Sequence, residues 1–413
     1  MKKRIAKILI PFFMSLTLLT ACQKAPEVSD DDEILRAKGS SEDAVEAIVN
    51  GEEEGASEAA EEAADDTSGE TAGSGTEAVS KDTEAVRVVL GSGESRMKID
   101  TEVAAVPDTV STLIMQTDSS LDEAALRNFL EPQGEVKDIT EEVLAAEEAE
   151  RQRVAEIDEK LGEGSSMVEI AGVGDGSRLA LTDGNRKAIL FGKTGGSYED
   201  AQLREKCYAS AKEEARKLDI KDMEAGNPAF SLQDAKALLT RKLSLLGIED
   251  IHLSIAYIYG QDGFLFYEMQ FSPVVEGIPT ADSFGQQDIA RVYSEGTAWV
   301  CEEGVANVEV WNCCMEQVSE VKNGKILNFS KVQDLLETYL DDGSLQCVED
   351  VPFSTAELVY YVELRDGKLE LVPMWSIHMD LEEYVKYAAQ SGRDDLVWNI
   401  YIDAVTGELV VVQ

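Results

Sequence analysis

Few residues of this chain have the type and spacing that catalysis requires. Only two histidines, His252 and His378, occur, so a metal site built from several imidazoles is impossible, which excludes most zinc hydrolases. Gly192-Lys193-Thr194 ends like a phosphate-binding loop, but Lys187 stands where the loop needs an earlier glycine. With 81 acidic residues, pairs such as Asp341-Asp342 arise by chance and are expected in solvated turns. The sequence therefore predicts no catalytic residue, no cofactor and no metal.

The tryptophans offer one place for a ligand. All four lie within the last 115 residues, and Trp375 and Trp398 could line a groove for a sugar or a peptide. The alternative is a position in the core, because Trp398 alternates with Leu396 and Ile400, as residues on one strand face do. Both interpretations stay open at this point.

Five cysteines follow Cys22 in the chain, at positions 207, 301, 313, 314 and 347. An odd number leaves at least one thiol unpaired in a monomer. Cys313 and Cys314 follow a strand pattern that starts at Val305, so their side chains are expected on opposite faces of the sheet. We expect buried structural cysteines here, with a redox or metal site as the alternative.

The net charge excludes one class of partner. The 413 residues carry 81 acidic and 37 basic side chains, a formal charge of −44. Such a chain repels phosphate backbones, so no nucleic-acid partner is expected. The length and the 44% hydrophobic content suffice for two or three folded domains.

The N-terminus has the form of an export signal. Lys2, Lys3 and Arg4 precede an apolar run, Ile8 to Leu19, which is too short to span a bilayer. Leu19-Thr20-Ala21-Cys22 resembles the bacterial lipobox, which implies cleavage between Ala21 and Cys22 and lipidation of Cys22 with fatty acids such as palmitate. The alternative is an ordinary secretory signal that contains a cysteine. We expect a protein lipid-anchored to the cell membrane and facing the extracellular side.

An acidic tether is expected to follow, over residues 22–86. From residue 23 to residue 86 there are 20 acidic and 4 basic residues and no aromatic residue. Such a composition cannot bury enough apolar surface to offset its conformational entropy, so the sequence predicts disorder. The segment would be a spacer, or alternatively an acidic ligand for a cation or a basic partner.

An N-terminal α+β domain is expected over residues 87–225. The helix near its start has Ser120 as the expected N-cap and Glu123 as the matching capping-box residue. A helix from Tyr198 to Lys217 is expected to end the domain. The remaining expected elements are strands at 96–106, 110–116, 167–173, 178–182 and 187–191 and helices at 121–130 and 140–161.

A second α+β domain, residues 226–413, is expected to contain two helix-plus-hairpin modules. In the first, Ser231 caps a helix to Leu246 with Asp234 in the capping box, and strands 251–259 and 264–272 flank Asp262-Gly263. In the second, Ser330 and Gln333 cap a helix to Leu340, and strands 358–364 and 368–377 flank Asp366-Gly367. Aligning the turns sets Phe271 against Trp375, and chance likeness of two common units is the alternative. Strands 396–403 and 408–412 close the chain.

The C-terminal sequence resembles a known class. Leu371-Val372-Pro373-Met374-Trp375, followed by Tyr401 to Leu409 with its Asp403-Ala404-Val405-Thr406-Gly407 turn, is similar to the end of PepSY-type modules and of the YycH/YycI class of extracytoplasmic regulators. Gly277-Ile278-Pro279-Thr280 resembles the stretch after the earlier module there. The whole chain also resembles uncharacterised surface lipoproteins of Gram-positive gut anaerobes. The resemblance implies regulation of a membrane histidine kinase or inhibition of a peptidase.

Together these features predict an α+β fold with antiparallel sheets, helices packed on one face, and a disordered tether before them. The expected function is non-enzymatic: a membrane-anchored lipoprotein that binds a protein partner or ligand at the cell surface, such as an envelope protein or a peptidoglycan-associated ligand. Regulation of an envelope enzyme or kinase would follow from that binding. The alternative is a glycan hydrolase or solute-binding lipoprotein.

Overall fold

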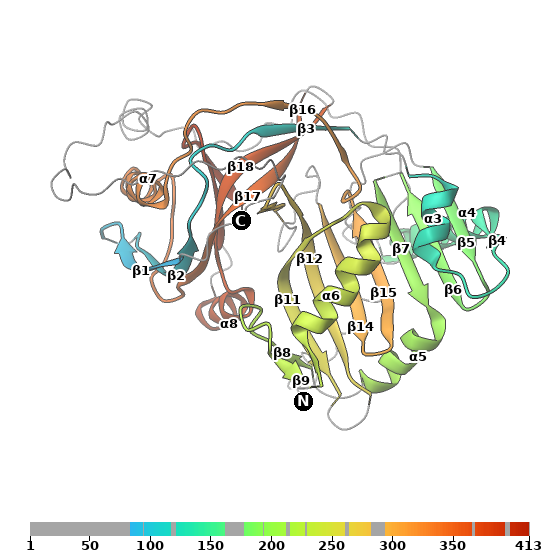
Figure 1. The fold of residues 1–413 in the computed structure, drawn as a ribbon. Coiled ribbons are helices and arrows are strands. Elements are labelled where there is room, and N and C mark those ends of the chain that lie inside the picture. The colour runs from blue at the N-terminus through green and yellow to red at the C-terminus, as the bar shows by residue number, and fades with distance from the viewer. Residues whose placement is uncertain are drawn as a thin grey trace, which may run out of the picture. The chain divides into compact units, whose positions relative to one another are not determined.

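The computed structural model describes residues 83–93, 95–116, 121–161, 177–192, 194–211, 215–227, 229–260, 264–281, 294–365, 368–392 and 397–412. Within them the fold is α+β, with six helices and sheets that are mainly antiparallel, which confirms the expected fold class (Figure 1). The helices are α3 (Glu123–Leu130), α4 (Thr140–Leu161), α5 (Ala201–Ser210), α6 (Leu232–Leu243), α7 (Phe329–Asp341) and α8 (Leu381–Ser391).

The described chain divides into two compact units that interleave along the sequence. The first contains Ser111–Val321 and Val359–Val372, and the second contains the described residues up to Val110, then Lys322–Leu358 and Pro373 onwards. The expected boundary between residues 225 and 226 does not separate these units.

A ten-stranded sheet organises the first unit, in the order β4-β5-β6-β7-β15-β14-β12-β11-β8 with β13 paired to β12. Every residue pairing given for it is antiparallel. Its strands are β4 (Lys137–Asp138), β5 (Arg178–Thr182), β6 (Arg186–Phe191), β7 (Gly195–Asp200), β8 (Arg216–Lys217), β11 (Ile251–Tyr259), β12 (Phe266–Val275), β13 (Ile278–Pro279), β14 (Glu295–Cys301) and β15 (Gly304–Trp311). The unit also holds the β9 (Gly226–Asn227) and β10 (Phe230–Ser231) pair, and β3 (Thr112–Gln116) with β16 (Glu316–Val321).

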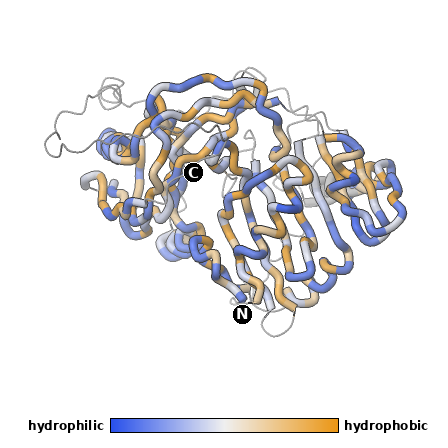
Figure 2. The backbone as a smooth tube through the Cα atoms, viewed as in Figure 1, coloured by the Kyte–Doolittle hydropathy of each residue, from blue (hydrophilic) through white to orange (hydrophobic). Residues whose placement is uncertain are grey.

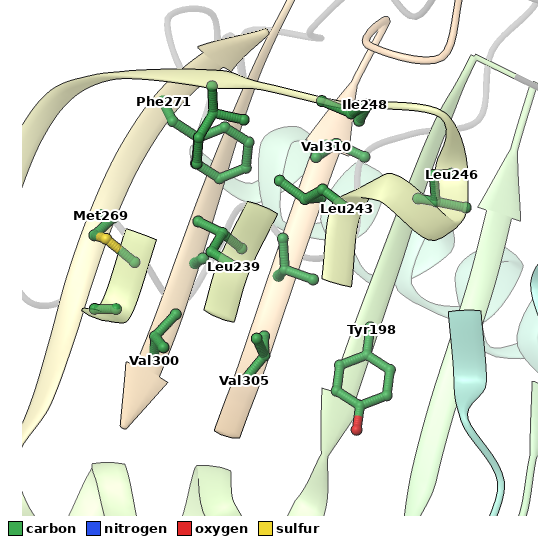
Figure 3. Packing of buried hydrophobic residues seen from close by; sticks show 14 of the residues in the cluster. Tyr198, Leu239, Leu243, Leu246, Ile248, Met269, Phe271, Val300, Val305 and Val310 are labelled. Carbon is green, nitrogen blue, oxygen red and sulfur yellow. The ribbon is translucent and has the colours of Figure 1, made fainter. Parts of the chain in front are cut away.

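The main core lies on one face of the ten-stranded sheet. Side chains from α3 and α6 pack there against alternate residues of the strands, as Figure 3 shows for Leu239, Leu243 and Phe271. Along the strands in Figure 2, hydrophobic and hydrophilic segments alternate, as a sheet with unlike faces requires. Gly296 lies opposite Phe271, and a Cβ there would come within 2.4 Å of the Phe271 ring. Glycine therefore leaves the space that the ring fills.

A smaller cluster lies on the second face, under α5. Cys207 of α5 packs with Phe266, Cys301 and Ala306. Residues 300 and 301 are consecutive on β14, and Val300 belongs to the main core whereas Cys301 belongs to this cluster. The two clusters therefore lie on opposite faces, and the sheet carries a helix on its second face as well.

The second unit contains the remaining strands. They are β1 (Thr83–Leu90), β2 (Met97–Ala104), β19 (Asn399–Asp403) and β20 (Leu409–Val412), with part of β17 (Phe353–Arg365) and of β18 (Lys368–Met379). β1 pairs with β2, and β18, β19 and β20 pair in that order, all antiparallel, whereas β17 meets β2 in parallel at Phe353 and Ile99.

Several expected elements are confirmed. Strands β5 and β11 have the expected bounds, α4 spans the expected residues with its first half mostly exposed, and both hairpin modules are present. The capping box of Ser231 and Asp234 forms at the start of α6, although a 3-10 turn replaces the helix after Leu243. Residues 167–173 and both Asp-Gly turns lie outside the described residues.

Other expectations need correction. Asp122, not Ser120, caps α3, and Asn328, not Ser330, caps α7, because each lies one residue before the first helical turn and its carboxylate or amide oxygen accepts a backbone N–H. The helix expected from Tyr198 to Lys217 is instead β7, α5 and β8, and its true N-cap is Asp200. β1 begins at Thr83, so the last four residues of the expected tether are strand. Helix α8 was not expected at all.

Candidate functional site

A pocket of about 300 Å³ lies in the first unit, on the face of the sheet that carries the main core. Polar side chains dominate its lining, with apolar contributions from leucine and valine. It is lined by Glu131, Gln133, Arg186, Tyr198, Asp200, Leu203, Leu238, Arg241, Lys242, Glu303, Gly304 and Val305. We call it the Lys242 pocket, after its most deeply buried charge.

Lys242 is held by three groups at the back of this pocket. The residue is 5% exposed, and its ammonium donates to the carbonyl oxygen of Phe129 and to Oε2 of Glu131, the latter at 2.8 Å. The ammonium nitrogen also lies 3.6 Å from the centroid of the Tyr198 ring. Burial lowers the pKa of Lys242 to about 8, and this outweighs the opposing effect of the Glu131 carboxylate.

The placement of Lys242 has a local cause. Leu232, Ala235, Leu239 and Lys242 follow the spacing of the buried stripe of α6, so the lysine lies on the side of the helix that faces the core. Its ammonium reaches the end of α3, where Glu131 is the C-cap in left-handed conformation. A cation at a helix C-terminus stabilises the unpaired carbonyls there.

A second ion pair fixes the other wall. Arg186 Nε lies 3.2 Å from Asp200 Oδ2, and Asp200 Oδ1 accepts from the backbone of Gln202 and Leu203 at the start of α5. Nearby, Asp183 accepts from the backbone N–H of Gln133, Asn185 and Arg186. Asp200 therefore has two roles: it caps the N-terminus of α5, and it neutralises Arg186 in the pocket wall.

Three donor side chains in the lining are left over, one of them the exposed Gln133 amide. Among the described residues, neither the Arg241 guanidinium nor the Tyr198 hydroxyl has a hydrogen-bond partner within the protein. Figure 3 shows the Tyr198 hydroxyl directed away from the other labelled core side chains. Burial raises the pKa of Tyr198, so the hydroxyl stays a neutral donor. The pocket can thus receive a group with acceptor oxygens, whereas the Lys242 ammonium is already occupied.

The residues singled out from sequence lie elsewhere. Trp375 is 1% exposed and its Nε1 donates to the Leu327 carbonyl at 2.8 Å, while Trp398 is 4% exposed and stacks on Tyr384. Side chains so enclosed offer no surface to a ligand, so both occupy the core positions that were the alternative to a groove. Ala21 and Cys22 lie outside the described residues.

The five described cysteines are all buried and unpaired. Burial raises the pKa of Cys207, Cys314 and Cys347 to about 12, so these thiols are poor nucleophiles at neutral pH. Cys313 and Cys314 were expected on opposite faces of a sheet, yet both contact the main core. The strand ends at Trp311, and Asn312 adopts φ +51°, which breaks the alternation.

No pattern in the sequence predicts the Lys242 pocket. One signal was available, because a lysine on the apolar stripe of a helix must find acceptors when it is buried. The partners of Lys242 lie 113 and 111 residues away in the chain, and no local pattern predicts them.

The described residues contain no group of three His, Cys, Asp or Glu side chains placed to bind a metal ion. None of the helices described is both long and apolar enough to cross a membrane.

The sequence matches no described protein family, and no curated protein is significantly similar to it. The structure is similar to the crystal structure of an uncharacterized protein from the Gram-positive bacterium Eubacterium rectale, with a TM-score of 0.40 and 13% sequence identity. That similarity covers 79% of this chain and 94% of the other.

Proposed function

We propose that this protein is a lipid-anchored extracytoplasmic lipoprotein that binds a protein partner or ligand without catalysing a reaction. The lipid on Cys22 would hold it at the outer side of the cell membrane. By its resemblance to PepSY-type modules and YycH/YycI regulators, binding would regulate an envelope enzyme or kinase.

One observation carries the binding part of the proposal. In the Lys242 pocket the charges of Lys242, Arg186 and Asp200 are engaged with neighbouring protein groups, which leaves Arg241, the Tyr198 hydroxyl and the Gln133 amide as the available donors. A catalytic site needs a nucleophile or base free to reach its substrate. Fixed internal pairs beside these free donors suit recognition of a carbonyl or carboxylate oxygen.

A pull-down of the full chain from detergent-solubilised membranes tests this. The protein is compared with Arg241→Ala, and with Lys236→Ala as the control, because Lys236 lies on the same helix but does not line the pocket. We expect the wild type and the control to recover the same partner and Arg241→Ala to lose it. Recovery of no partner, together with glycan turnover that stops when one Asp or Glu is changed, would contradict the proposal.

The anchor has its own test. Metabolic labelling with a fatty-acid analogue should mark the wild-type protein, and Cys22→Ser should remove the label. Equal labelling of both would show that Cys22 is not the lipidated residue. The result is independent of the pull-down, so the two parts of the proposal can fail separately.

A further inference from the structure

The second face of the ten-stranded sheet, opposite the Lys242 pocket, carries an unusual row of side chains. Cross-strand register places Ser197 opposite Glu309, Glu309 opposite Thr297, and Thr297 opposite Gln270. Four adjacent strands, β7, β15, β14 and β12, thus contribute one polar residue each. We call Ser197, Glu309, Thr297 and Gln270 the polar row.

The polar row differs from the rest of that face. Under α5 the same face is closed by the apolar cluster of Cys207, Phe266, Cys301 and Ala306. Ser197, Thr297 and Gln270 are only half-buried. The neighbouring row holds Trp299, also half-buried, opposite Asn307. The Trp299 ring packs against Tyr208 of α5 and against Phe266, so it marks where the half-buried polar row meets the apolar cluster.

Glu309 stands out within the row because it is buried and has no partner. The residue is 8% exposed, and among the described residues none forms a hydrogen bond or an ion pair with its carboxylate. Among fully enclosed side-chain oxygens and nitrogens of the described chain, only Asn399 Oδ1 lacks a partner. Because its oxygens are not among these enclosed atoms, the Glu309 carboxylate keeps a small exposure to solvent.

The other carboxylates of this face are already satisfied. Glu199 pairs with Arg204, Glu268 accepts from the Tyr259 hydroxyl at 2.5 Å, and Glu295 accepts from Gln270 Nε2 at 3.3 Å. Only Glu309 of these four is left without a donor. An unpaired buried carboxyl is destabilising, and a threonine or valine would serve the sheet better. Groups kept at such a cost are typical of binding sites.

We propose that the polar row is a binding site for an organic cation, whose ammonium group contacts the Glu309 carboxylate and whose apolar part lies along Trp299. The hydroxyls of Ser197 and Thr297, on the flanking strands, supply further acceptors for ammonium hydrogens. The net charge of −44 favours the approach of cations. This site is separate from the Lys242 pocket.

The charged groups around Glu309 and its burial determine whether its carboxyl releases a proton when the organic cation binds. Lys187 and Arg204 act on the carboxyl from β6 and α5, and burial raises its pKa to about 8 against their effect. Glu199, Glu268 and Glu295 are the acids on the same face. At pH 7 the carboxyl is mainly protonated when the site is empty. Binding of an ammonium ion then ionises it, and the released proton passes to the buffer.

Benzylamine is a suitable probe, because it joins an ammonium group to an aromatic ring, and benzyl alcohol is its neutral counterpart. Isothermal titration calorimetry on the detergent-solubilised full chain should show benzylamine binding more tightly than benzyl alcohol by about tenfold or more. Titrations in buffers of different ionisation enthalpy should reveal proton release, and the affinity for benzylamine should rise from pH 6 to pH 8.

Variants locate the site. Glu309→Gln should weaken benzylamine binding by about tenfold and abolish proton release, whereas Glu302→Gln, at an exposed turn, should change neither. Circular dichroism confirms that both variants fold. Equal affinity for benzylamine and benzyl alcohol in the wild type, no binding of either at about 10 mM, or full binding by folded Glu309→Gln would overturn the proposal. The comparison of the two probes holds even if Glu309→Gln does not fold.

Discussion

The two faces of the ten-stranded sheet each bury an ionisable group, and they treat it in opposite ways. On the core face, Lys242 has its ammonium directed at the Phe129 carbonyl, the Glu131 carboxylate and the Tyr198 ring. On the second face, no donor from the part of the chain that the structure describes reaches the Glu309 carboxylate. Both groups have a pKa of about 8, displaced toward the neutral form by burial.

The comparison teaches that burial alone does not reveal what a charged residue does. A buried charge whose hydrogen-bonding capacity is filled by the protein connects elements, as Lys242 connects α6 to the end of α3. A buried charged group that lacks hydrogen-bond partners in the protein destabilises the fold, unless a ligand supplies those partners. The pKa is similar in the two cases, so the hydrogen-bond partners distinguish them.

The largest expected effect separates Glu309 from ordinary surface acids. The folded-state pKa is raised from 4.5 to about 8, so the wild type loses stability through this group as the pH rises from 4.5 to 8. The Glu309→Gln variant has no carboxyl at this position, so its stability does not fall with pH through this residue. Between pH 4.5 and pH 8 the difference in the free energy of unfolding should shift in favour of the variant by about 4 kcal/mol. Urea unfolding of both proteins at the two pH values measures the shift.

The control for that experiment is Glu302→Gln, whose difference from the wild type should not depend on pH by more than about 0.5 kcal/mol. A Glu309→Gln difference that stays constant across the range would show that the carboxyl is ionised throughout, and the contrast between the two faces would fail.

Removing the Lys242 ammonium should destabilise the protein. Lys242→Met keeps the buried stem but leaves the Phe129 carbonyl without its donor, at a cost of about 2 kcal/mol. Since the folded-state pKa is lowered from 10.5 to about 8, the wild type gains stability through this lysine as the pH rises across that interval. The deficit of the variant should therefore be larger at pH 9.5 than at pH 7 in guanidinium unfolding.

Lys236→Met, at a half-buried position of the same helix that loses only a partly exposed ion pair with Asp250, should change the free energy of unfolding by no more than about 1 kcal/mol. If Lys242→Met were equally harmless, the ammonium would not connect α6 to α3, and Lys242 would be available for another role.

A smaller effect is expected at the cap of α5. Asp200→Ala removes the acceptor for the N–H groups of Gln202 and Leu203 and the partner of Arg186. We expect a loss of about 1 to 1.5 kcal/mol, measured by thermal unfolding, with Glu205→Ala on the same helix as the control. An Asp200→Ala protein as stable as the control would mean that water caps the helix equally well.

The smallest effect should come from Arg241→Ala. The side chain is exposed and has no partner among the described residues, so the free energy of unfolding should change by less than about 0.5 kcal/mol. A larger loss would make this variant unsuitable for separating binding from folding in the pull-down.

Local signals predicted local structure well. Ser231 and Asp234 lie three residues apart before an apolar stripe, and they form the predicted capping box because the atoms involved belong to one helical turn. The cap of α7 was misplaced because Asn328 and Ser330 are both good capping residues two positions apart. The helix expected from Tyr198 failed for a stronger reason: Tyr198 pairs with Val308, and a partner 110 residues away decides that the segment is a strand.

The sequence alone determined the α+β class, the two helix-plus-hairpin modules and the absence of any familiar catalytic motif, since each depends on periodicity or on spacing within a few residues. The tertiary structure alone decided which distant residues meet. Pairing of β7 with β15 brings Ser197 beside Glu309, and packing of α6 on the end of α3 brings Lys242 to Glu131. No local sequence pattern predicts either contact, because strand order and helix packing depend on the whole core. The sequence of one segment indicates only which of its own faces is apolar.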